Sequence, residues 1–321
     1  MVKIKFVDVE DWFREDTIKI LRCKNIEFVE SDNPDFIFYS VFGYEHMKYD
    51  CVRIFFTGEN IQPDFNICDY AIGFSNIEYG DRYLRCPLYY FYTKDYERAC
   101  NKPILTEDEL QGKKFCNFVY SNSSAYPERE QIFRILSEYK RVDSGGKFLN
   151  NIGGPISDKY EFQRNYKFSI AFENACTAGY TTEKILQAFA AGTVPIYYGN
   201  PNIAEEFNEK AFINCHKYGS FAEVRDLVEK IDKDDRLFLQ YRNQPMKLSN
   251  MEKDAKEAYA DFVEMILRQE PHNAIRRCNQ CWGTMYQDFM RSYIAVKEIC
   301  KNPKGICDKF VRKNINRYVE K

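Results

Sequence analysis

The sequence is poor in histidine and tryptophan, carries almost no net charge and contains no long apolar run. Its 321 residues include 3 His and 2 Trp, and 46 basic against 48 acidic residues leave a formal net charge of −2. A chain so close to neutrality has no overall field to attract nucleic acid, so we expect no nucleic-acid partner. The histidines His46, His216 and His272 lie far apart in the sequence, which gives no basis for a histidine-activated nucleophile.

The sequence pattern also shows no export signal and no membrane-spanning segment. The first nine residues alternate like a short strand rather than an apolar export signal, and no segment reaches membrane-spanning length. We therefore expect a cytoplasmic protein. The basic tail 301–321 could rest on an anionic membrane surface, which would make the protein peripheral, or could pack on the protein as a short helix.

Two common nucleotide-binding motifs are absent. No Gly-x-Gly-x-x-Gly occurs, which argues against a dehydrogenase, and Gly145-Gly146-Lys147 lacks both the upstream glycine and the following Ser or Thr of a P-loop. Asp232-Lys233-Asp234 has the spelling of a metal-binding Asp-x-Asp pair. Because it ends an amphipathic helical pattern, we interpret it as solvated surface and predict no essential metal and no cofactor.

The twelve cysteines are scattered through strand-like and helical segments. Without an export signal, we expect most of them to be buried thiols rather than disulfides. Cys278 and Cys281 have the spacing of a metal knuckle, but Cys300 and Cys307 do not repeat that spacing. Helical spacing near a domain end is the interpretation we favour for the pair.

The length and the 45% apolar content predict two α/β domains. A first set of elements is expected as a helix at 11–22 and strands at 3–9, 25–30, 35–43, 53–57 and 68–74. A mixed, charged stretch at 93–113 suits a connection. A second set follows, with strands at 114–120, 167–172, 194–198 and 211–215 and helices at 127–140, 156–165, 182–191, 201–207 and 220–231. Such alternation predicts a parallel, doubly wound sheet. We place the domains at 1–100 and 101–270, followed by a helical segment at 271–321.

The densest chemistry lies where the strand ending at Phe172-Glu173-Asn174 leads through a small-residue loop into Tyr180-Thr181-Thr182-Glu183-Lys184. Ligands of open α/β domains bind at this carboxyl edge of the sheet. Thr182 can cap the following helix, whose N-terminus favours an anionic group, and Lys184 adds a positive charge suited to a diphosphate. Glu183 could accept hydrogen bonds from sugar hydroxyls, and Tyr180 offers a stacking face. An ordinary capped helix with an acidic first turn explains the same residues.

The segment from Phe172 through Lys184 to Ala191-Gly192-Thr193-Val194-Pro195-Ile196-Tyr197-Tyr198-Gly199 closely resembles the donor-binding signature of the α-1,3/4-fucosyltransferases. The similarity continues upstream at 116–122 and 139–146, and in the first domain at 56–60. The resemblance implies two facing Rossmann-like domains, the GT-B glycosyltransferase architecture, with the sugar nucleotide held by the C-terminal domain.

The same resemblance implies roles for individual residues. Arg129, Asn174 and Lys184 would contact the diphosphate of GDP-fucose, and Tyr180 and Glu183 would contact the nucleoside or fucose. Arg129 also suits this role physically, since an arginine in a first helical turn can fork onto phosphate oxygens, although an exposed helix-surface arginine is the simpler interpretation.

An inverting transfer needs a base for the acceptor hydroxyl, and Glu59 is the candidate catalytic residue. It follows a strand-like run and a Thr57-Gly58 turn, which would project it from the first domain into the cleft. The resemblance implies the same role. A carboxylate in a surface turn is the alternative, and Glu173 is a rival carboxylate that could instead orient a neighbour. Asp69, Glu78, Asp81 and Arg82 are expected to give support or acceptor contacts.

By resemblance, the expected reaction is inverting transfer of fucose from GDP-fucose to O3 of N-acetylglucosamine in a lactosamine-type oligosaccharide, as in Lewis antigen synthesis. The partners would be GDP-fucose and that acceptor. The alternatives are α-1,4 or dual linkage, a transferase of the same fold that uses another GDP-sugar, or a catalytically inactive glycan-binding relative. The sequence leaves the linkage, the acceptor type and the oligomeric state open.

Overall fold

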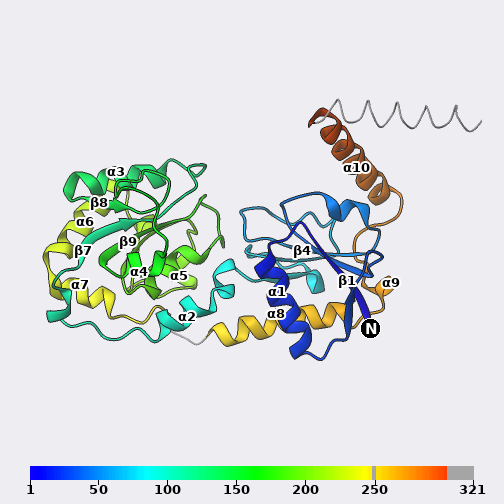
Figure 1. The fold of residues 1–321 in the computed structure, drawn as a ribbon, viewed down its shortest axis with the longest axis horizontal. Coiled ribbons are helices and arrows are strands. Elements are labelled where there is room, and N and C mark those ends of the chain that lie inside the picture. Colours follow the sequence, from blue (N-terminus) through cyan, green and yellow to red (C-terminus); the bar gives the residue numbers. More distant parts are fainter. Residues whose placement is uncertain (248–250, 302–321) are drawn as a thin grey trace, which may run out of the picture.

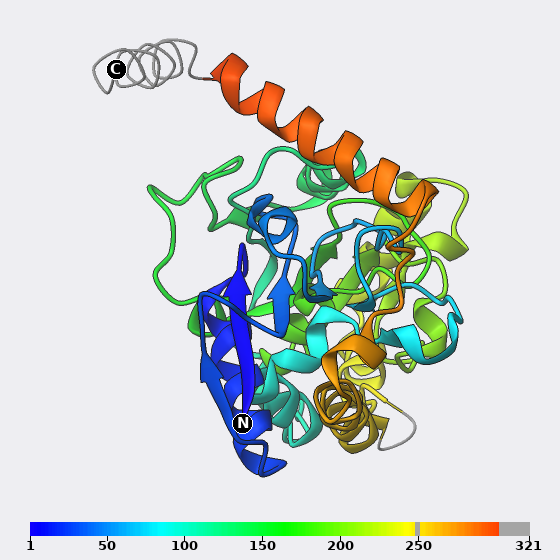
Figure 2. The same ribbon diagram turned by 90° about the vertical axis from the view of Figure 1, so that its right-hand side faces the viewer.

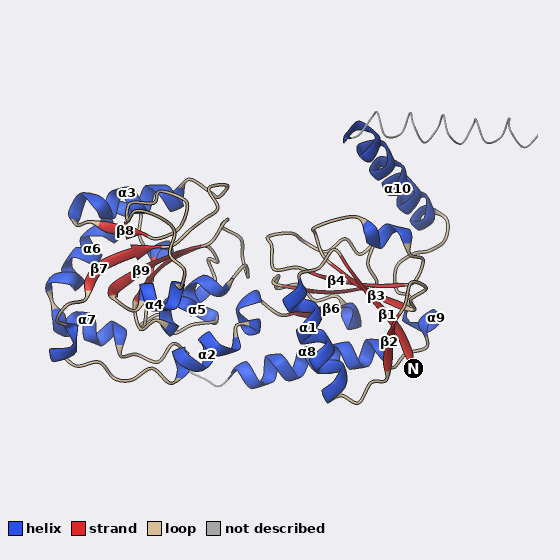
Figure 3. Cartoon of the chain, in the orientation of Figure 1, coloured by secondary structure: helices blue, strands red, loops and turns tan. Residues whose placement is uncertain are grey.

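The computed structural model describes residues 1–247 and 251–301, which form two α/β domains lying side by side (Figure 1). Each domain is built on a fully parallel sheet, and Figure 3 shows the two sheets lying apart, one in each domain. The α/β class and the arrangement of two facing Rossmann-like domains, as in GT-B glycosyltransferases, are confirmed.

The first sheet has six strands in the order β2-β1-β3-β4-β5-β6. The bounds of its strands are β1 Val2–Val7, β2 Phe28–Glu30, β3 Phe36–Tyr39, β4 Val52–Phe56, β5 Tyr70–Gly73 and β6 Tyr83–Arg85. Both faces of the sheet are covered, so its central strands are apolar without alternation, as parallel strands usually are. Ile54 and Phe56 belong to the cluster under helix α1 (Asp11–Cys23), whereas Phe55 belongs to the cluster on the opposite face.

The second sheet has the order β11-β10-β9-β7-β8. Its strands are β7 Lys114–Phe118, β8 Val142–Ser144, β9 Tyr166–Phe172, β10 Val194–Tyr198 and β11 Ile213–Asn214. The helices of this part are α3 Glu128–Tyr139, α4 Lys159–Gln163, α5 Glu183–Ala190, α6 Phe221–Lys233 and α7 Asp235–Arg242. One face of the sheet packs on α3 and α6, while α5 lies on the other face and turns toward the first domain.

The connection between the domains is more ordered than the charged stretch at 93–113 suggested. It contains helix α2 (Thr93–Cys100), which packs along α5. Tyr89 and Tyr96 from this side share one apolar cluster with Ile185 and Phe189 of α5. One apolar cluster therefore continues from the first domain to α5 of the second domain and joins the two domains.

Helix α8 (Met251–Leu267) lies within residues 101–270, which the sequence pattern assigns to the second domain, yet it packs on the first. The Tyr259 hydroxyl lies 2.9 Å from that of Thr17 on α1, and Lys24 is ion-paired with Asp261. The cause is an apolar stripe on α8, from Tyr259 to Leu267, that completes the core beneath the first sheet. The chain therefore returns to its starting domain before the expected boundary at 270.

The C-terminal part of the described chain is helical, with α9 (Pro271–Ala274) and α10 (Trp282–Lys301). Arg277, fully buried, pairs with the buried Asp69 carboxylate and fixes the turn before α10 to the first sheet. Helix α10 lies against the first domain, where the Tyr286 hydroxyl donates to Asp64 at 2.6 Å and Arg291 donates to the Met47 carbonyl at 3.2 Å, and Figure 2 shows its C-terminal end projecting beyond the domains. Within the part of the chain that is described, no helix combines the length and apolar character needed to cross a bilayer. The basic tail expected to contact a membrane lies, beyond residue 301, outside the described residues.

Three expectations about individual residues are wrong. Among the eleven cysteines described, four are buried and five are exposed, so most are not buried thiols. Cys278 and Cys281 lie in the turn before α10 rather than in a helix. Asp232 is not solvated surface, because it is 8% exposed and accepts hydrogen bonds from Tyr139 and Lys140. The apolar face of α6 carries this carboxylate inward, where it joins α6 to α3.

Candidate active site

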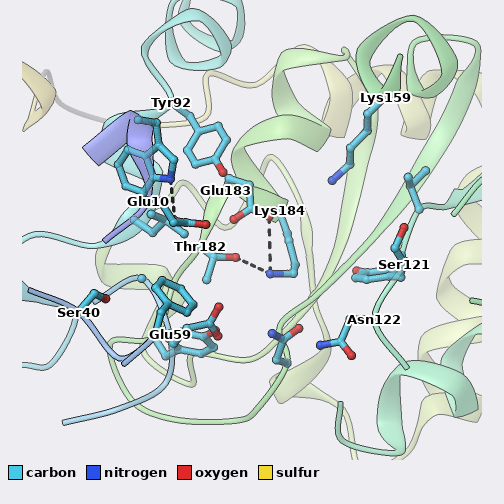
Figure 4. Close-up of a pocket in the computed structure, with 18 of the residues that line it drawn as sticks. Glu10, Ser40, Glu59, Tyr92, Ser121, Asn122, Lys159, Thr182, Glu183 and Lys184 are labelled. Atoms are coloured by element: carbon cyan, nitrogen blue, oxygen red, sulfur yellow. Dashed lines mark hydrogen bonds and ion pairs between the residues drawn. The ribbon is translucent and has the colours of Figure 1, made fainter. Parts of the chain in front are cut away.

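A cavity of about 380 Å³ lies between the carboxyl ends of the two sheets (Figure 4). Residues of the first domain, including Glu59, line one side, and residues around α5 and the loop after β7 line the other. Of the predicted site residues, the structure brings to this cavity Glu59, Arg129, Asn174, Tyr180, Glu183 and Lys184. This edge of a parallel sheet is where ligands of such folds bind.

A buried carboxylate organises the N-terminus of α5. Glu173 is 3% exposed and directly follows β9. Its two oxygens accept hydrogen bonds from the Thr182 backbone N–H at 2.8 Å and the Thr182 hydroxyl at 2.6 Å. The Lys184 ammonium donates to Glu173 at 3.0 Å and to the Thr182 hydroxyl at 2.7 Å. Thr182 occupies the N-cap position as expected, but its hydroxyl serves this network and does not cap the helix. Glu173 thus holds Lys184 in place from beneath the cavity.

The charge of Lys184 is fixed by this network. Burial alone would lower the pKa of the lysine, but Glu173 and Glu183 together raise it well above its ordinary value. Burial likewise acts to raise the pKa of Glu183, yet Lys184 and Lys159 bring it below its ordinary value. Both groups are therefore ionised at neutral pH, and the cavity presents a fixed cation at the N-terminus of α5.

Arg129 is not the exposed helix-surface arginine of the simpler interpretation, because it is 2% exposed. Its guanidinium lies over the Tyr120 ring, 4.2 Å from the centroid, and donates to the Asn174 side-chain oxygen at 2.6 Å. It also donates to the Phe172 carbonyl at 3.2 Å. Arg129 thereby joins α3 to the end of β9 and fixes the Asn174 amide at the cavity wall, and its buried Nε has no partner within the described residues.

The loop between Asn174 and α5 lies against the first domain. Gly179 has φ +80°, and a Cβ at this position would stand 2.6 Å from the Phe74 carbonyl oxygen, so only glycine fits. Tyr180 next to it is 2% exposed and packs edge to face on Phe74. Asn60, also of the first domain, donates to the Thr177 hydroxyl at 2.9 Å. From the second domain, the Asn200 side-chain oxygen accepts the Gly179 backbone N–H at 2.8 Å. The loop that carries the donor-site residues is therefore positioned by both domains.

Glu59 reaches the cavity from the first domain as an exposed residue. Its backbone N–H donates to the Thr57 hydroxyl at 3.0 Å, which holds the turn after β4. The described residues show no hydrogen bond or ion pair to its carboxylate, and Figure 4 places this side chain across the cavity from Lys184. A carboxylate with free oxygens at such a site can accept a proton from a bound hydroxyl.

Other polar residues singled out in the sequence do not line the cavity. Asp69 accepts the Arg53 backbone N–H at 2.8 Å and pairs with Arg277, and Arg82 donates to the carbonyls of Phe65 and Cys68. These contacts hold the first domain together, so the support role applies. Glu78 and Asp81 also lie outside the cavity lining, and Asp81 pairs with Arg276.

Lys159 of the cavity was missed by sequence reasoning. It is the first residue of α4 and its ammonium donates to the Gln187 side-chain oxygen at 2.6 Å. The residue stands outside the donor-binding signature in the sequence, and only a lysine at the start of a predicted helix could have drawn notice. Within the described residues, no group of three or more His, Cys, Asp or Glu side chains is arranged to hold a metal ion.

Comparison with known proteins places both halves of the chain. Residues 4–92 match the family model of the alpha-(1,3)-fucosyltransferase FucT N-terminal domain, and residues 110–299 match that of the glycosyltransferase family 10 (fucosyltransferase) C-terminal part. The chain is 33% identical over 273 residues to alpha-(1,3)-fucosyltransferase FucT of Helicobacter pylori, which covers 70% of this chain and 56% of the relative. The chain thus spans little more than half the length of that relative.

Two further relatives are informative. GDP-fucose protein O-fucosyltransferase 3 of Homo sapiens is 32% identical over 152 residues, covering 43% of this chain and 32% of that protein. The crystal structure of an alpha1,3-fucosyltransferase with GDP-fucose superposes with a TM-score of 0.72 at 27% identity, covering 87% of this chain and 93% of the other. With the two-domain fold, the cleft and these matches together, the chain belongs to glycosyltransferase family 10, the fucosyltransferases.

Proposed function

We propose that this protein is an inverting α-1,3-fucosyltransferase that moves fucose from GDP-fucose to O3 of N-acetylglucosamine in a lactosamine-type acceptor. The proposal rests on one observation: Lys184, a fixed cation, and Glu59, an exposed carboxylate, line the same cavity from its two sides. The family membership supports the donor, since both the Helicobacter pylori relative and the superposed structure are alpha-1,3-fucosyltransferases by name.

The donor would lie along the second domain. Its diphosphate would accept hydrogen bonds from Lys184, Asn174 and the N-terminus of α5, with Arg129 holding the Asn174 amide in place. Glu183 and Tyr180 would contact the sugar or ribose hydroxyls. No step of this reaction requires a metal ion, because the protein itself supplies cations for the leaving group.

In the transfer step the Glu59 carboxylate would take the proton of the acceptor hydroxyl as its oxygen attacks C1 of fucose. The bond between C1 and the β-phosphate oxygen breaks on the opposite face, and GDP leaves with the electron pair. Lys184 lies where the charge of the departing diphosphate develops, and its pKa, raised by Glu173 and Glu183 against the effect of burial, keeps it protonated. Attack and departure on opposite faces invert the configuration at C1.

A second candidate acceptor is a protein hydroxyl. The match to GDP-fucose protein O-fucosyltransferase 3 covers 43% of the chain and favours this alternative, with GDP-fucose as the donor. In this chain Glu59 would again be the base. The two candidates differ only in what approaches the first-domain side of the cavity. Dual or α-1,4 linkage, another GDP-sugar as donor, and binding without catalysis are further outcomes that one experiment can separate.

The test is calorimetric titration with GDP-fucose, GDP-mannose, UDP-galactose and GDP, on the wild type, Lys184→Ala and the matched control Lys210→Ala, an exposed lysine of the second domain. Transfer is assayed on type 1 and type 2 lactosamine acceptors and on a Ser/Thr peptide, and linkage is assigned by NMR. Selective binding of GDP and GDP-fucose, weakened tenfold or more in Lys184→Ala but not in Lys210→Ala, with transfer to O3 of lactosamine, supports the proposal. Fucosylation of the peptide alone would favour the second candidate, and no binding of any guanine nucleotide would refute both.

A further inference from the structure

Lys159 is a cation of the cavity that the reaction described above does not use. Its ammonium is held by Gln187, one turn after Glu183 on α5, so the two residues share one face of that helix. In Figure 4 the Lys159 side chain reaches from α4 toward Glu183 and Lys184. Lys159 therefore lies beside the donor site rather than on the outer surface of the domain.

The electrostatic environment of Lys159 differs from that of Lys184. Lys184 stands 3.0 Å from Glu173 and 3.7 Å from Glu183, whereas the described residues place no carboxylate oxygen within 4.0 Å of the Lys159 ammonium. Its bonded partner is the neutral amide oxygen of Gln187. Burial lowers the pKa of Lys159, so the ammonium is desolvated without a compensating ion pair. Of its three N–H groups, two remain for a ligand.

Three charged residues lie one after another along the cavity. Glu59 lies at the first-domain end, Lys184 lies in the middle, and Lys159 lies with Ser121 on the second-domain side (Figure 4). If fucose faces Glu59 and the diphosphate lies at Lys184, as in the proposed function, the remaining part of the donor would extend toward Lys159. That part is the nucleoside.

We propose that Lys159 determines the base specificity of the donor site by donating to the O6 and N7 atoms of guanine. These two adjacent acceptors are the groups that a lysine ammonium recognises on guanine, whereas adenine presents an amino donor in place of O6. Gln187 is the positioning residue that directs the ammonium. The inference rests on the proposed function, because it assumes a guanine nucleotide donor with its diphosphate at Lys184.

The experiment compares the affinities of GDP, 7-deaza-GDP, ADP and pyrophosphate for the wild type, Lys159→Met and Lys159→Arg by calorimetry. Wild type should prefer GDP to ADP and should bind 7-deaza-GDP less well than GDP. Lys159→Met should weaken GDP binding about five- to a hundredfold, leave ADP and pyrophosphate unchanged, and no longer distinguish GDP from 7-deaza-GDP. Lys159→Arg should retain part of the preference, since arginine reads the same two atoms.

Several outcomes would overturn the inference. Equal weakening of GDP, ADP and pyrophosphate binding in Lys159→Met would show that the ammonium binds the diphosphate. An unchanged preference for GDP over ADP in this variant would show that Lys159 does not contact the base. If the variant does not fold, equal wild-type affinity for GDP and 7-deaza-GDP would still refute the N7 contact. Absence of any GDP binding to the wild type would instead refute the proposed function on which the inference rests.

Discussion

The two sides of the cavity are built differently. On the second-domain side the charged groups are mutually bonded and buried: Glu173 holds Thr182 and Lys184, and Arg129 holds Asn174. On the first-domain side, the exposed Glu59 is held through its backbone N–H, with no side-chain bond to the rest of the described chain, and the exposed Phe42 also lines the cavity. The second-domain side, where we propose that the donor binds, is fixed by its own hydrogen bonds and ion pairs, whereas the proposed acceptor side is open.

This difference has a physical reason. A phosphate-binding cation is most effective when it does not need to reorganise, and a buried lysine requires a carboxylate to remain charged. Glu173 meets that requirement at the cost of burying its own charge, which the N-terminus of α5 offsets. A general base has the opposite requirement, because it must have free oxygens when the acceptor hydroxyl arrives.

The largest expected effect is that of Glu59→Gln on transfer. Removing the base should lower kcat by roughly 10²- to 10⁴-fold, while the affinity for GDP-fucose and the thermal stability stay at wild-type values, because the carboxylate carries no bond in the described structure. Steady-state kinetics, calorimetry and a melting curve measure the three quantities. Retained turnover would show that Glu59 is not the base.

The matching change on the donor side, Glu173→Gln, should act on stability instead. In the amide one of the two acceptor oxygens becomes an NH₂ donor. Either the Thr182 backbone N–H, which is bonded to Oε1, or the Thr182 hydroxyl and the Lys184 ammonium, which share Oε2, then lose their acceptor. We expect a loss of about 1–3 kcal/mol in the free energy of unfolding, measured by denaturant titration. Glu205→Gln, at an exposed position of the same domain, is the control and should change little. A variant as stable as the wild type would contradict the preorganised donor site.

Contact between the two sides is tested by Gly179→Ala. The added Cβ would meet the Phe74 carbonyl at 2.6 Å, in addition to the strain of φ +80°. Gly112→Ala is a matched control, since φ there is +85° and the space is open. Both variants should lose about 1–2 kcal/mol for the left-handed conformation, and Gly179→Ala should lose more and raise KM for the donor. Equal losses would mean that the loop moves freely against the first domain.

Much of the donor side was predictable because local patterns encode it. The strand ending at Phe172, the loop and the helix from Glu183 follow from periodicity, and the helix start places Lys184 at the sheet edge. The role of Glu173 beneath Lys184 was less visible, because a carboxylate next to Asn174 could equally have faced the ligand. Only the packing of β9 against α5 decides its direction.

Features that depend on distant segments could not be predicted. Lys159 joins the site through Gln187, 28 residues later, and no short motif records that contact. Asp232 was interpreted as a surface residue because its sequence neighbours are charged. Its burial depends instead on Tyr139 and Lys140, at the end of α3, which donate to its carboxylate. Strands β6 and β8 have three residues each, too few to show alternation. The packing of helix α8 on the first domain could not be predicted, because it depends on which of the two apolar cores the other elements leave exposed.

The smallest expected effect is on the free energy of unfolding at acid pH, where the wild type is compared with Glu183→Gln. The folded-state pKa of Glu183 lies below the ordinary 4.5, because Lys184 and Lys159 outweigh the opposing effect of burial. Its contribution to stability is therefore complete above pH 4.5 and is lost as the pH falls through the lowered folded-state pKa. The size of that contribution is about 1.4 kcal/mol for every tenfold difference between the acid dissociation constants of the folded and unfolded states. Denaturant titrations of wild type and Glu183→Gln between pH 7 and pH 3 should converge at the acid end. Lys184, whose pKa is raised, stays protonated throughout this range. Curves that remain parallel would therefore mean that Glu183 gains nothing from the neighbouring lysines and that the second-domain side depends on Glu173 for its fixed charge.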